Sequence, residues 1–465
     1  MGCAGSTRGD VSERRGSLTE ELESGELRTD LLYKRRDSQD YAGVSSRGAA
    51  APAPAAATAT TAAASSRPGR SRRRTEFSDF SIEHKLGWGA HAKVYLVRRK
   101  QCDQRFAMKV ISKNQLVTKA RLEKMVMRER DILSKLSHPF MVNLHYAFQT
   151  TQHLIFVMDY VGGGELFYHL HERERPPVLT DSGFVSSGFP EAQARLYVAE
   201  LASALLYVHS LNVVYRDLKP ENVLLREDGH IALCDFGLSV QDPNSTQSLA
   251  GTVEYLPPEV LTGLTMLSFG VDWWALGVLM WELLECEVPF SLPSGELAEP
   301  TNPGDVEQIV RKQLDGVPFP QHFSPEAQLF LRSLLQPVPE LRIGHHERKS
   351  AQLLKESPWL TAIDWTALEA GEYPPVFAPG DVSAAEVADD PFSSGEDELR
   401  LSSSASYSSD LGDLGLHGFS FTAPNAKTFS ALAHADSCGS LEHLPAELSR
   451  TPQASFSGSL ILAAT

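Results

Sequence analysis

Residues 215–225 read Tyr-Arg-Asp-Leu-Lys-Pro-Glu-Asn-Val-Leu-Leu, and Asp235-Phe236-Gly237 follows shortly after them. The first stretch sets an acid, a lysine and an amide at fixed offsets in a loop, and its last apolar residues can anchor that loop on a strand. An Asp that orients a hydroxyl, with an Asn and a second Asp that can share metal ions, suits phosphoryl transfer, which is catalysed mainly by positioned charge. A solvated loop is the alternative, but the length of the string argues against it.

The 465-residue chain is conventionally globular only in its middle. Aromatic and branched aliphatic residues concentrate between about Phe77 and Trp365, which is enough for one two-lobed domain. The N-terminal residues are rich in Ser, Arg, Gly and Ala and cannot bury enough apolar surface to offset the entropy of ordering. We therefore expect disordered termini, with an N-terminal extension over 1–79 and a C-terminal segment over 431–465.

Charge and cysteine usage narrow the class of protein. The formal charge of −16 argues against general nucleic-acid binding. The five cysteines are scattered without a C-x-x-C pair, which favours a reduced, intracellular compartment without structural zinc. No long uncharged apolar run and no hydrophobic signal core are present, so we expect no membrane span and no secretion. The sequence thus predicts a cytoplasmic monomer.

The N-terminus carries a candidate lipidation signal. Met1 to Ser6 fits the myristoylation pattern, which exposes Gly2 after Met removal, and Cys3 could accept a second acyl chain. One acyl chain gives only marginal membrane affinity, so peripheral membrane association would need Cys3 or the basic run 67–74. An accidental Met-Gly start is the alternative, and the basic run could equally be a nuclear address or a solvated linker.

The segment from Phe80 predicts a nucleotide-binding hairpin. Residues 80–86 and 94–97 are β-prone, and a tight turn containing Gly87 and Gly89 lies between them. Glycines lack side chains, so the backbone there can approach phosphate oxygens closely. An ordinary hairpin is the alternative for a lone G-x-G turn, but the next strand carries an inward lysine.

That lysine, Lys109, would pair the α- and β-phosphates and needs a carboxylate to hold it. The helical stretch 119–136 supplies Glu129, which is set among apolar residues, and Glu123 is its rival. We prefer Glu129 by its spacing from Lys109 and from the strand that follows.

The remaining pattern predicts an α+β fold with two lobes. Residues 143–148 and 154–160 complete an antiparallel sheet of five strands, and the glycine run 162–164 looks like a hinge. Beyond it, 190–209 has a helical apolar stripe, and 272–284 is apolar on nearly every face and should be a buried central helix. The active site should lie in the cleft between the small β lobe and the larger, mainly α-helical lobe.

With these elements placed, residues 80–360 resemble the eukaryotic protein kinases, and within them the AGC group and its ribosomal protein S6 kinase family. The resemblance implies a kinase domain over 80–360 and an AGC-type C-terminal tail over 361–430 with a hydrophobic motif. The motifs that carry it are Tyr215 in place of His, 251–259, 145–150, 163–167 and the tail motif 416–424.

The resemblance implies roles for individual residues in a reaction that uses ATP and Mg²⁺. Asp217 is similar to the catalytic base that orients the substrate hydroxyl, and Lys219 to the group that steadies the γ-phosphate. Asn222 and Asp235 would bind magnesium, and the Lys109–Glu129 ion pair would form in the active state. The residues implied in nucleotide binding are Leu86, Gly87, Gly89, Val94, Ala107, Lys109, Asp159, Val161, Glu165 and Leu224, with Met158 at the back of the pocket.

Further resemblances concern substrates. Glu165, Glu221 and Glu282 match acids that select arginine upstream of the target Ser or Thr, and plain surface carboxylates are the alternative. Glu259 with Arg342 resembles the buried ion pair of the activation segment. The implied partners are protein substrates and an upstream activating kinase.

Regulation has implied sites as well. Ser248 stands where an activation-loop phosphate would bind Arg216. Ser420 would carry the hydrophobic-motif phosphate, locking two apolar side chains in a groove of the small lobe, while a disordered tail is the alternative. Ser402 or Ser403 could be a turn-motif site.

Four departures from the family are visible. Ala92 replaces the third glycine, and Met125 and Val240 stand where basic or polar partners are frequent. Residues 171–190 are longer than the norm and read as a flexible surface insertion.

A serine/threonine protein kinase is the leading hypothesis, because Lys109, Glu129, Asp217, Lys219, Asn222 and Asp235 are all present. A scaffold is disfavoured for the same reason. A small-molecule kinase is disfavoured by the segment 251–259.

Overall fold

A computed structural model describes the chain in segments: residues 74–88, 92–117, 120–173, 178–179, 185–241, 251–263, 268–292, 302–344, 347–379, 416 and 419–423. The acylation signal at Gly2 and Cys3, Gly89, the candidate phosphosites Ser248, Ser402 and Ser403, and the C-terminal segment lie outside these residues. Residues 74–79 correct the expected boundary at 79, because they are ordered. A 3₁₀ turn at Phe77–Asp79 precedes the first strand, and Lys100 N donates to Asp79 O over 3.0 Å.

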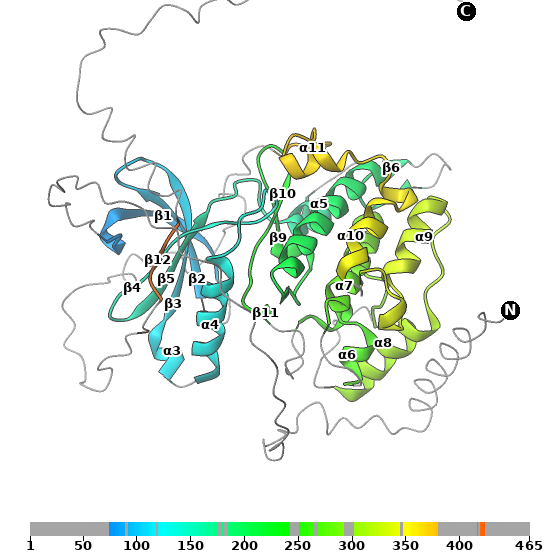
Figure 1. Ribbon diagram of the computed structural model, residues 1–465, viewed down its shortest axis with the longest axis horizontal. Helices are drawn as coiled ribbons and strands as arrows, with labels where there is room; N and C mark the ends of the chain where they lie inside the picture. Colours follow the sequence, from blue (N-terminus) through cyan, green and yellow to red (C-terminus); the bar gives the residue numbers. More distant parts are fainter. Residues whose placement is uncertain are drawn as a thin grey trace, which may run out of the picture. The chain divides into compact units, whose positions relative to one another are not determined.

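The small lobe is built on one antiparallel sheet with strand order β1-β2-β3-β5-β4-β12 (Figure 1). Five consecutive strands were predicted and are present, and β12 from the C-terminal tail adds a sixth. Their bounds are β1 Phe80–Trp88, β2 Ala92–Arg99, β3 Arg105–Ser112, β4 Leu144–Gln149, β5 His153–Asp159 and β12 Phe421–Thr422.

Alternation along β3 fixes the direction of Lys109. Phe106, Met108 and Val110 are buried on one face of the strand, whereas Ala107 and Lys109 are only half-buried on the other. Successive side chains of a strand point to opposite faces, so these two residues share the face away from the buried set.

Two helices accompany the sheet, α3 (Lys113–Val117) and α4 (Ala120–Leu133). Leu122, Val126 and Leu133 are buried, and Glu129 is in register with them on the same stripe of α4. The helical period therefore turns the Glu129 carboxylate inward with the apolar side chains.

The large lobe contains most of the helices and several short strands (Figure 1), two of which, β8 and β9, flank the catalytic loop at residues 215–222. Its helices are α5 Glu191–Ser210, α6 Pro258–Leu261, α7 Gly270–Glu285, α8 Pro303–Asp315, α9 Pro325–Leu334, α10 Glu347–Lys355 and α11 Trp365–Ala370. Its strands are β6 Val178–Leu179, β7 Val185–Ser186, β8 Val213–Val214, β9 Val223–Leu225, β10 Ile231–Leu233 and β11 Val240–Gln241.

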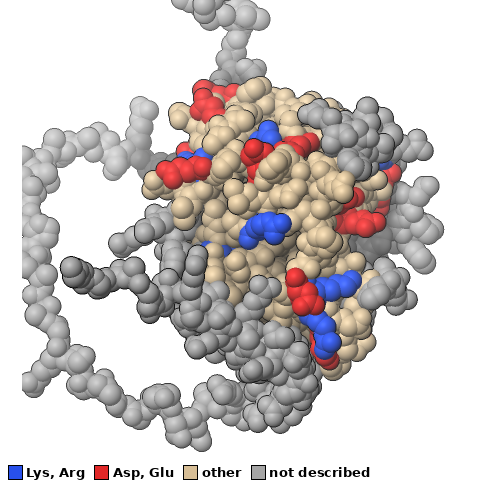
Figure 2. Space-filling model, turned by 90° about the vertical axis from the view of Figure 1, so that its right-hand side faces the viewer, with Lys and Arg blue, Asp and Glu red and all other residues tan. Residues whose placement is uncertain are grey.

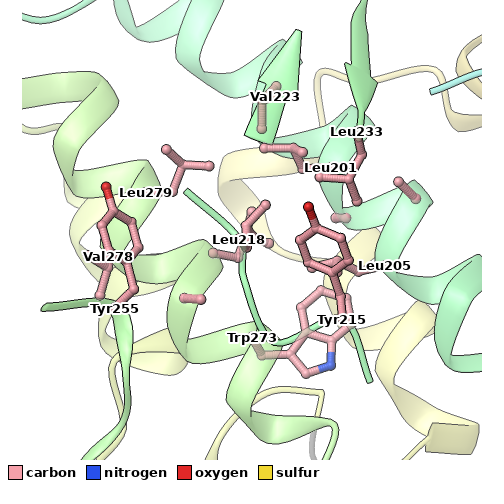
Figure 3. Close-up of a cluster of buried hydrophobic side chains, with 14 of the residues drawn as sticks. Leu201, Leu205, Tyr215, Leu218, Val223, Leu233, Tyr255, Trp273, Val278 and Leu279 are labelled. Carbon is pink, nitrogen blue, oxygen red and sulfur yellow. The ribbon is translucent and has the colours of Figure 1, made fainter. Parts of the chain in front are cut away.

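Helix α7 is buried from Gly270 to Leu284, as its apolar composition predicted. Figure 3 shows how it anchors the catalytic loop: Leu218 of that loop lies among side chains of α5 and α7, between Tyr215 and Tyr255. Burial of a leucine side chain contributes about 1.5–3 kcal/mol, which holds the loop on the core.

The glycine run predicted as a hinge packs closely against β9. A Cβ on Gly163 would stand 2.3 Å from Leu225 O, and Gly164 has a φ of 79°. Leu225 N donates to Gly164 O over 2.8 Å. These residues are therefore glycines because the backbone approaches β9 closely and turns into the left-handed region.

The described residues of segment 171–190, which its composition predicted to be a flexible surface insertion, include a strand pair and contacts with α7. Strands β6 and β7 form a hairpin, and the end of the segment packs on α7. Ser186 Oγ donates to Leu284 O over 2.6 Å, and Phe189, which is buried, donates its N–H to Leu283 O over 2.7 Å. Main-chain hydrogen bonds to the end of a buried helix give this segment a fixed attachment.

The surface carries charges of both signs. On the face shown in Figure 2, Lys and Arg side chains are interspersed with Asp and Glu among uncharged residues. Local pairs such as Arg311–Glu307, with N and O 2.8 Å apart, are exposed. No helix among the described residues has the length and apolar character needed to cross a bilayer.

Candidate active site

The catalytic loop between β8 and β9 brings Asp217 and Asn222 together. Asn222 Nδ2 donates to Asp217 Oδ2 and to Asp217 O, both over 2.7 Å. A 3₁₀ turn at Pro220–Asn222, with Pro at its start, folds the amide back onto the acid. Asp217 is half-buried. The acid and the amide predicted from the sequence thus form one unit.

Burial raises the pKa of Asp217 above its ordinary value, and repulsion from Asp235 adds to this shift. Lys219 and the hydrogen bond from Asn222 act in the opposite direction without cancelling it. A raised pKa brings a carboxylate closer to the working range of a general base.

Asp272 holds the catalytic loop in place, and the sequence reasoning assigned it no role. Its oxygens accept from Tyr215 N at 2.8 Å and Arg216 N at 2.7 Å, and His209 Nε2 lies 2.8 Å away. Arg216 has a φ of 74°, a strained backbone for a non-glycine residue. The sequence feature that could have indicated this role is a single acid at the start of an otherwise apolar helix.

Lys109 joins the small lobe to Asp235. Its Nζ lies 2.6 Å from Glu129 Oε1 and 3.3 Å from Asp235 Oδ1. Burial alone would lower the pKa of Lys109, but the two carboxylates outweigh it and the net shift is upward. Glu129, and not the rival Glu123, is the partner in this structure.

Asp235 sits on a strained turn, from which its carboxylate reaches Lys109. Its φ is 49°, and Gly237 N donates to its Oδ1 over 3.1 Å. Lys109 lowers the pKa of Asp235 more than burial raises it, so this carboxylate is ionised at neutral pH. Phe236, which lies between Asp235 and Gly237 in the sequence, is buried against Tyr215, and their ring centroids are 5.1 Å apart.

Asn222 and Asp235 have the donor atoms that Mg²⁺ requires. Asn222 uses its amide nitrogen on Asp217, which leaves the carbonyl oxygen turned away from that acid. Cys234 N donates to Asn222 O over 3.0 Å, so Asp235 follows directly on a residue bonded to Asn222. Magnesium in phosphate-handling sites takes one or two such oxygens together with phosphates and water, and these residues fit that set.

The residues predicted to enclose adenine lie together. Val161 and Leu224 belong to a small apolar cluster with Val142, Ala232 and Met158. On the neighbouring strand Ala107 is the cross-strand partner of Met158. On the first hairpin Gly87 pairs with Val94, and a Cβ on Gly87 would meet nothing within 4 Å. Among the described residues, space is therefore open beside Gly87, next to the half-buried Leu86.

Asp159 is placed differently from the other nucleotide-binding predictions. Its carboxylate accepts from Asn143 N at 3.0 Å and Asn143 Nδ2 at 2.8 Å, and His145 Nε2 lies 2.6 Å away. Burial would raise the pKa of Asp159, but these hydrogen bonds lower it overall. The carboxylate is thus held by Asn143, just before β4, and by His145 on that strand.

The three predicted substrate-selecting acids are not equivalent. Glu165 and Glu221 are exposed, whereas Glu282 is buried on α7. Although its side chain reaches solvent, partial desolvation by its surroundings, followed by repulsion from Glu221 and Glu172, raises the pKa of Glu165. The alternative of a plain surface carboxylate is therefore wrong for Glu282.

The segment 251–259 is tied to both the catalytic loop and the large lobe. Lys219 Nζ donates to Thr252 Oγ1 over 3.4 Å. The predicted Glu259–Arg342 pair is bidentate, at 2.7 and 3.0 Å, and both side chains are buried. Val240 is also buried, where it packs against Val214 and Phe269, while Met125 is half-buried.

The hydrophobic motif of the tail docks on the small lobe. Phe419 is fully buried with its ring centroid 5.3 Å from that of Phe156, and Leu416 is buried as well. Strand β12 pairs antiparallel with β4, and Ala423 N donates to His145 O over 2.8 Å. Ser420 is exposed between these anchors. The alternative of an undocked tail is wrong for these residues.

Comparison with known proteins shows which proteins this chain resembles. The family model for the protein kinase domain matches residues 80–360. The Arabidopsis thaliana serine/threonine-protein kinase AtPK2/AtPK19 is 39% identical over 303 residues, 65% of this chain and 59% of that protein. Danio rerio Sgk1 is 42% identical over 307 residues, 65% of this chain and 64% of that protein. Human ribosomal protein S6 kinase alpha-4 is 38% identical over 309 residues, 65% of this chain and 37% of that protein. The chain thus spans less than two thirds of the length of each of these relatives.

Proposed function

Because the chain belongs to the protein kinase family, we propose that it is an active, ATP- and magnesium-dependent protein kinase that phosphorylates serine and threonine. The observation that carries the proposal is the completed Lys109–Glu129 ion pair, whose lysine also reaches Asp235. The names of the relatives, which include serine/threonine-protein kinases, support the class of residue phosphorylated.

The residues of the cleft divide the work. Asp217 accepts a hydrogen bond from the incoming hydroxyl and orients its oxygen, and Asn222 fixes the carboxylate for this task. Lys219 and Lys109 hold phosphate charge from two sides. Asn222 and Asp235 would hold Mg²⁺, which neutralises charge on the transferred phosphoryl group. Positioning and electrostatics supply most of the catalysis in this reaction, and these side chains provide both.

We propose two phosphorylation sites that control this activity. The exposed Ser420 lies between docked residues of the hydrophobic motif, so a phosphate there would hold β12 and Phe419 on the lobe that carries α4. Ser248 would bind Arg216 once an upstream kinase phosphorylates it. Mass spectrometry of the protein from its native cells tests both sites and also reports whether Gly2 and Cys3 carry acyl chains at a membrane.

A transfer assay on the full chain tests the proposed function. With ATP and Mg²⁺, peptides that carry serine or threonine downstream of arginine should be phosphorylated, and tyrosine peptides should not. No transfer to any peptide, even when Ser248 and Ser420 are phosphorylated, would refute the proposal.

A further inference from the structure

Both oxygens of the Glu282 carboxylate are already engaged. Glu282 Oε1 lies 2.8 Å from His171 Nε2, and Oε2 accepts a hydrogen bond from the Tyr255 hydroxyl. Its side chain is 6% exposed. A carboxylate enclosed in this way, unlike an acid in solvent, is not free to bind a cation.

His171 is held in this position from three sides. Nε2 faces Glu282, Nδ1 lies 3.4 Å from Cys286 Sγ, and the ring packs on Phe167 with centroids 4.7 Å apart. Because a carboxylate only accepts, Nε2 carries the proton of this bond. Cys286 ends α7 with a φ of 64°, a conformation that favours glycine, and this turn brings its sulfur beside the ring.

His171 lies in the helical turn Tyr168–Glu172, at the start of segment 171–190. The side chain of His171 contacts α7 through Glu282, and the other end of the segment contacts the same helix through Ser186 and Phe189. Gly188 allows this return, since a Cβ there would stand 2.2 Å from the Leu284 carbonyl. The last turn of α7, which carries Glu282, is thus bounded by both ends of the insertion.

Glu165 and Glu221 present the opposite situation. Both are exposed, and within the described residues neither forms an ion pair. Their mutual repulsion contributes to the raised pKa of Glu165. A guanidinium group would relieve this repulsion, so these two acids attract cations without prior rearrangement.

We propose that His171 is a specificity-determining residue, which competes with substrate arginine for Glu282. This inference rests on the proposed function. Arginine selection then depends mainly on Glu165 and Glu221, and an arginine gains Glu282 only by displacing His171. The kinase should therefore show a weaker requirement for arginine at the upstream position that faces Glu282 than its three acids suggest.

Steady-state kinetics on the full chain test the competition. The quantity measured is the ratio of kcat/KM for a serine peptide with arginine at each upstream position to kcat/KM for the same peptide with alanine there. His171→Ala should raise this ratio roughly tenfold at one position, the value of about one charged hydrogen bond. The gain should be absent in His171→Ala combined with Glu282→Gln.

Two further variants keep the result interpretable. His171→Gln retains a donor for the carboxylate and should keep the wild-type ratio, and Cys286→Ser should keep it because His171 remains in place. If the double variant unfolds, the ratios measured for His171→Ala and His171→Gln are sufficient to test the competition. Equal ratios for wild type and His171→Ala at every position, or a gain that persists in the double variant, would overturn the inference. Absence of transfer to all peptides by the wild type would instead refute the proposed function.

Discussion

Lys109 Nζ lies 2.6 Å from Glu129 Oε1, an ion pair that joins β3 to α4 inside the small lobe. Glu129 reaches it because the carboxylate shares the inward stripe of α4 with buried Leu122 and Val126. The same ammonium is 3.3 Å from Asp235 in the other lobe. The position of one helix therefore determines where the Lys109 ammonium group is held.

Glu129→Gln should lower kcat/KM for ATP by more than roughly tenfold, because Lys109 loses the charge that fixes it. Steady-state kinetics with ATP as the varied substrate measure this effect. Glu123→Gln is the matched control, since Glu123 lies on the same helix without contacting Lys109. A Glu123→Gln enzyme as impaired as Glu129→Gln would contradict the assignment of the pair.

The fall in kcat/KM at low pH should follow the protonation of Asp217. Its pKa is raised, so the ionised form needed for catalysis is lost, as pH falls, above the ordinary aspartate value of about 3.9. The positive charge of Lys219 lowers this pKa, and Lys219→Met should therefore move this fall to higher pH as well as slow the reaction. The pH dependence of kcat/KM measures both effects. If kcat/KM of Lys219→Met fell at the same pH as that of the wild type, or at a lower pH, this would count against Asp217 as the titrating group.

Phe419→Ala should release the hydrophobic motif. Truncation of a fully buried phenylalanine costs about 3–5 kcal/mol, more than a two-residue strand can recover. Hydrogen exchange should then show the amides of β12 and Ala423 unprotected, and kcat/KM should fall. Thr422→Ala, an exposed neighbour on β12, should leave protection as in the wild type. Protected β12 amides in Phe419→Ala would show that the aromatic contact is not the anchor.

Arg342→Ala should destabilise the large lobe by about 3–5 kcal/mol, because it leaves the buried Glu259 carboxylate without its bidentate partner. Denaturant unfolding measures the change in the free energy of unfolding. Arg311→Ala breaks an exposed pair with Glu307 and should cost no more than about 1 kcal/mol. Similar losses in the two variants would mean that burial does not set the value of the 259–342 pair.

Much of the active site was predictable because the residues stand at fixed offsets. The unit formed by Asp217 and Asn222 lies within one loop, and spacing along the chain favoured Glu129 over its rival Glu123 as the partner of Lys109. Five of the six strands of the sheet also followed from local β-prone runs. Such signals depend on neighbouring residues, which a sequence displays directly.

The missed features are contacts between distant segments that carry no local pattern. Asp272 binds Tyr215 N across 57 positions of the chain, and nothing near either residue specifies the bond. The attachment of the insertion uses main-chain groups of α7, so its polar, Gly- and Ser-containing composition indicated flexibility. The side-chain partners of Asp159 were not predicted either, since Asn143 and His145 lie at and before the start of β4, the neighbouring strand of the sheet.

A single-turnover comparison of the wild type with Asp217→Asn tests the central claim most directly. Both proteins are phosphorylated at Ser248 and Ser420, loaded with ATP and Mg²⁺, and mixed with a serine peptide that carries upstream arginine. The wild type should transfer the γ-phosphate faster by several powers of ten, as loss of a catalytic group generally implies, while both bind ATP alike. Equal rates in the two proteins would show that the Asp217 carboxylate does not catalyse the transfer.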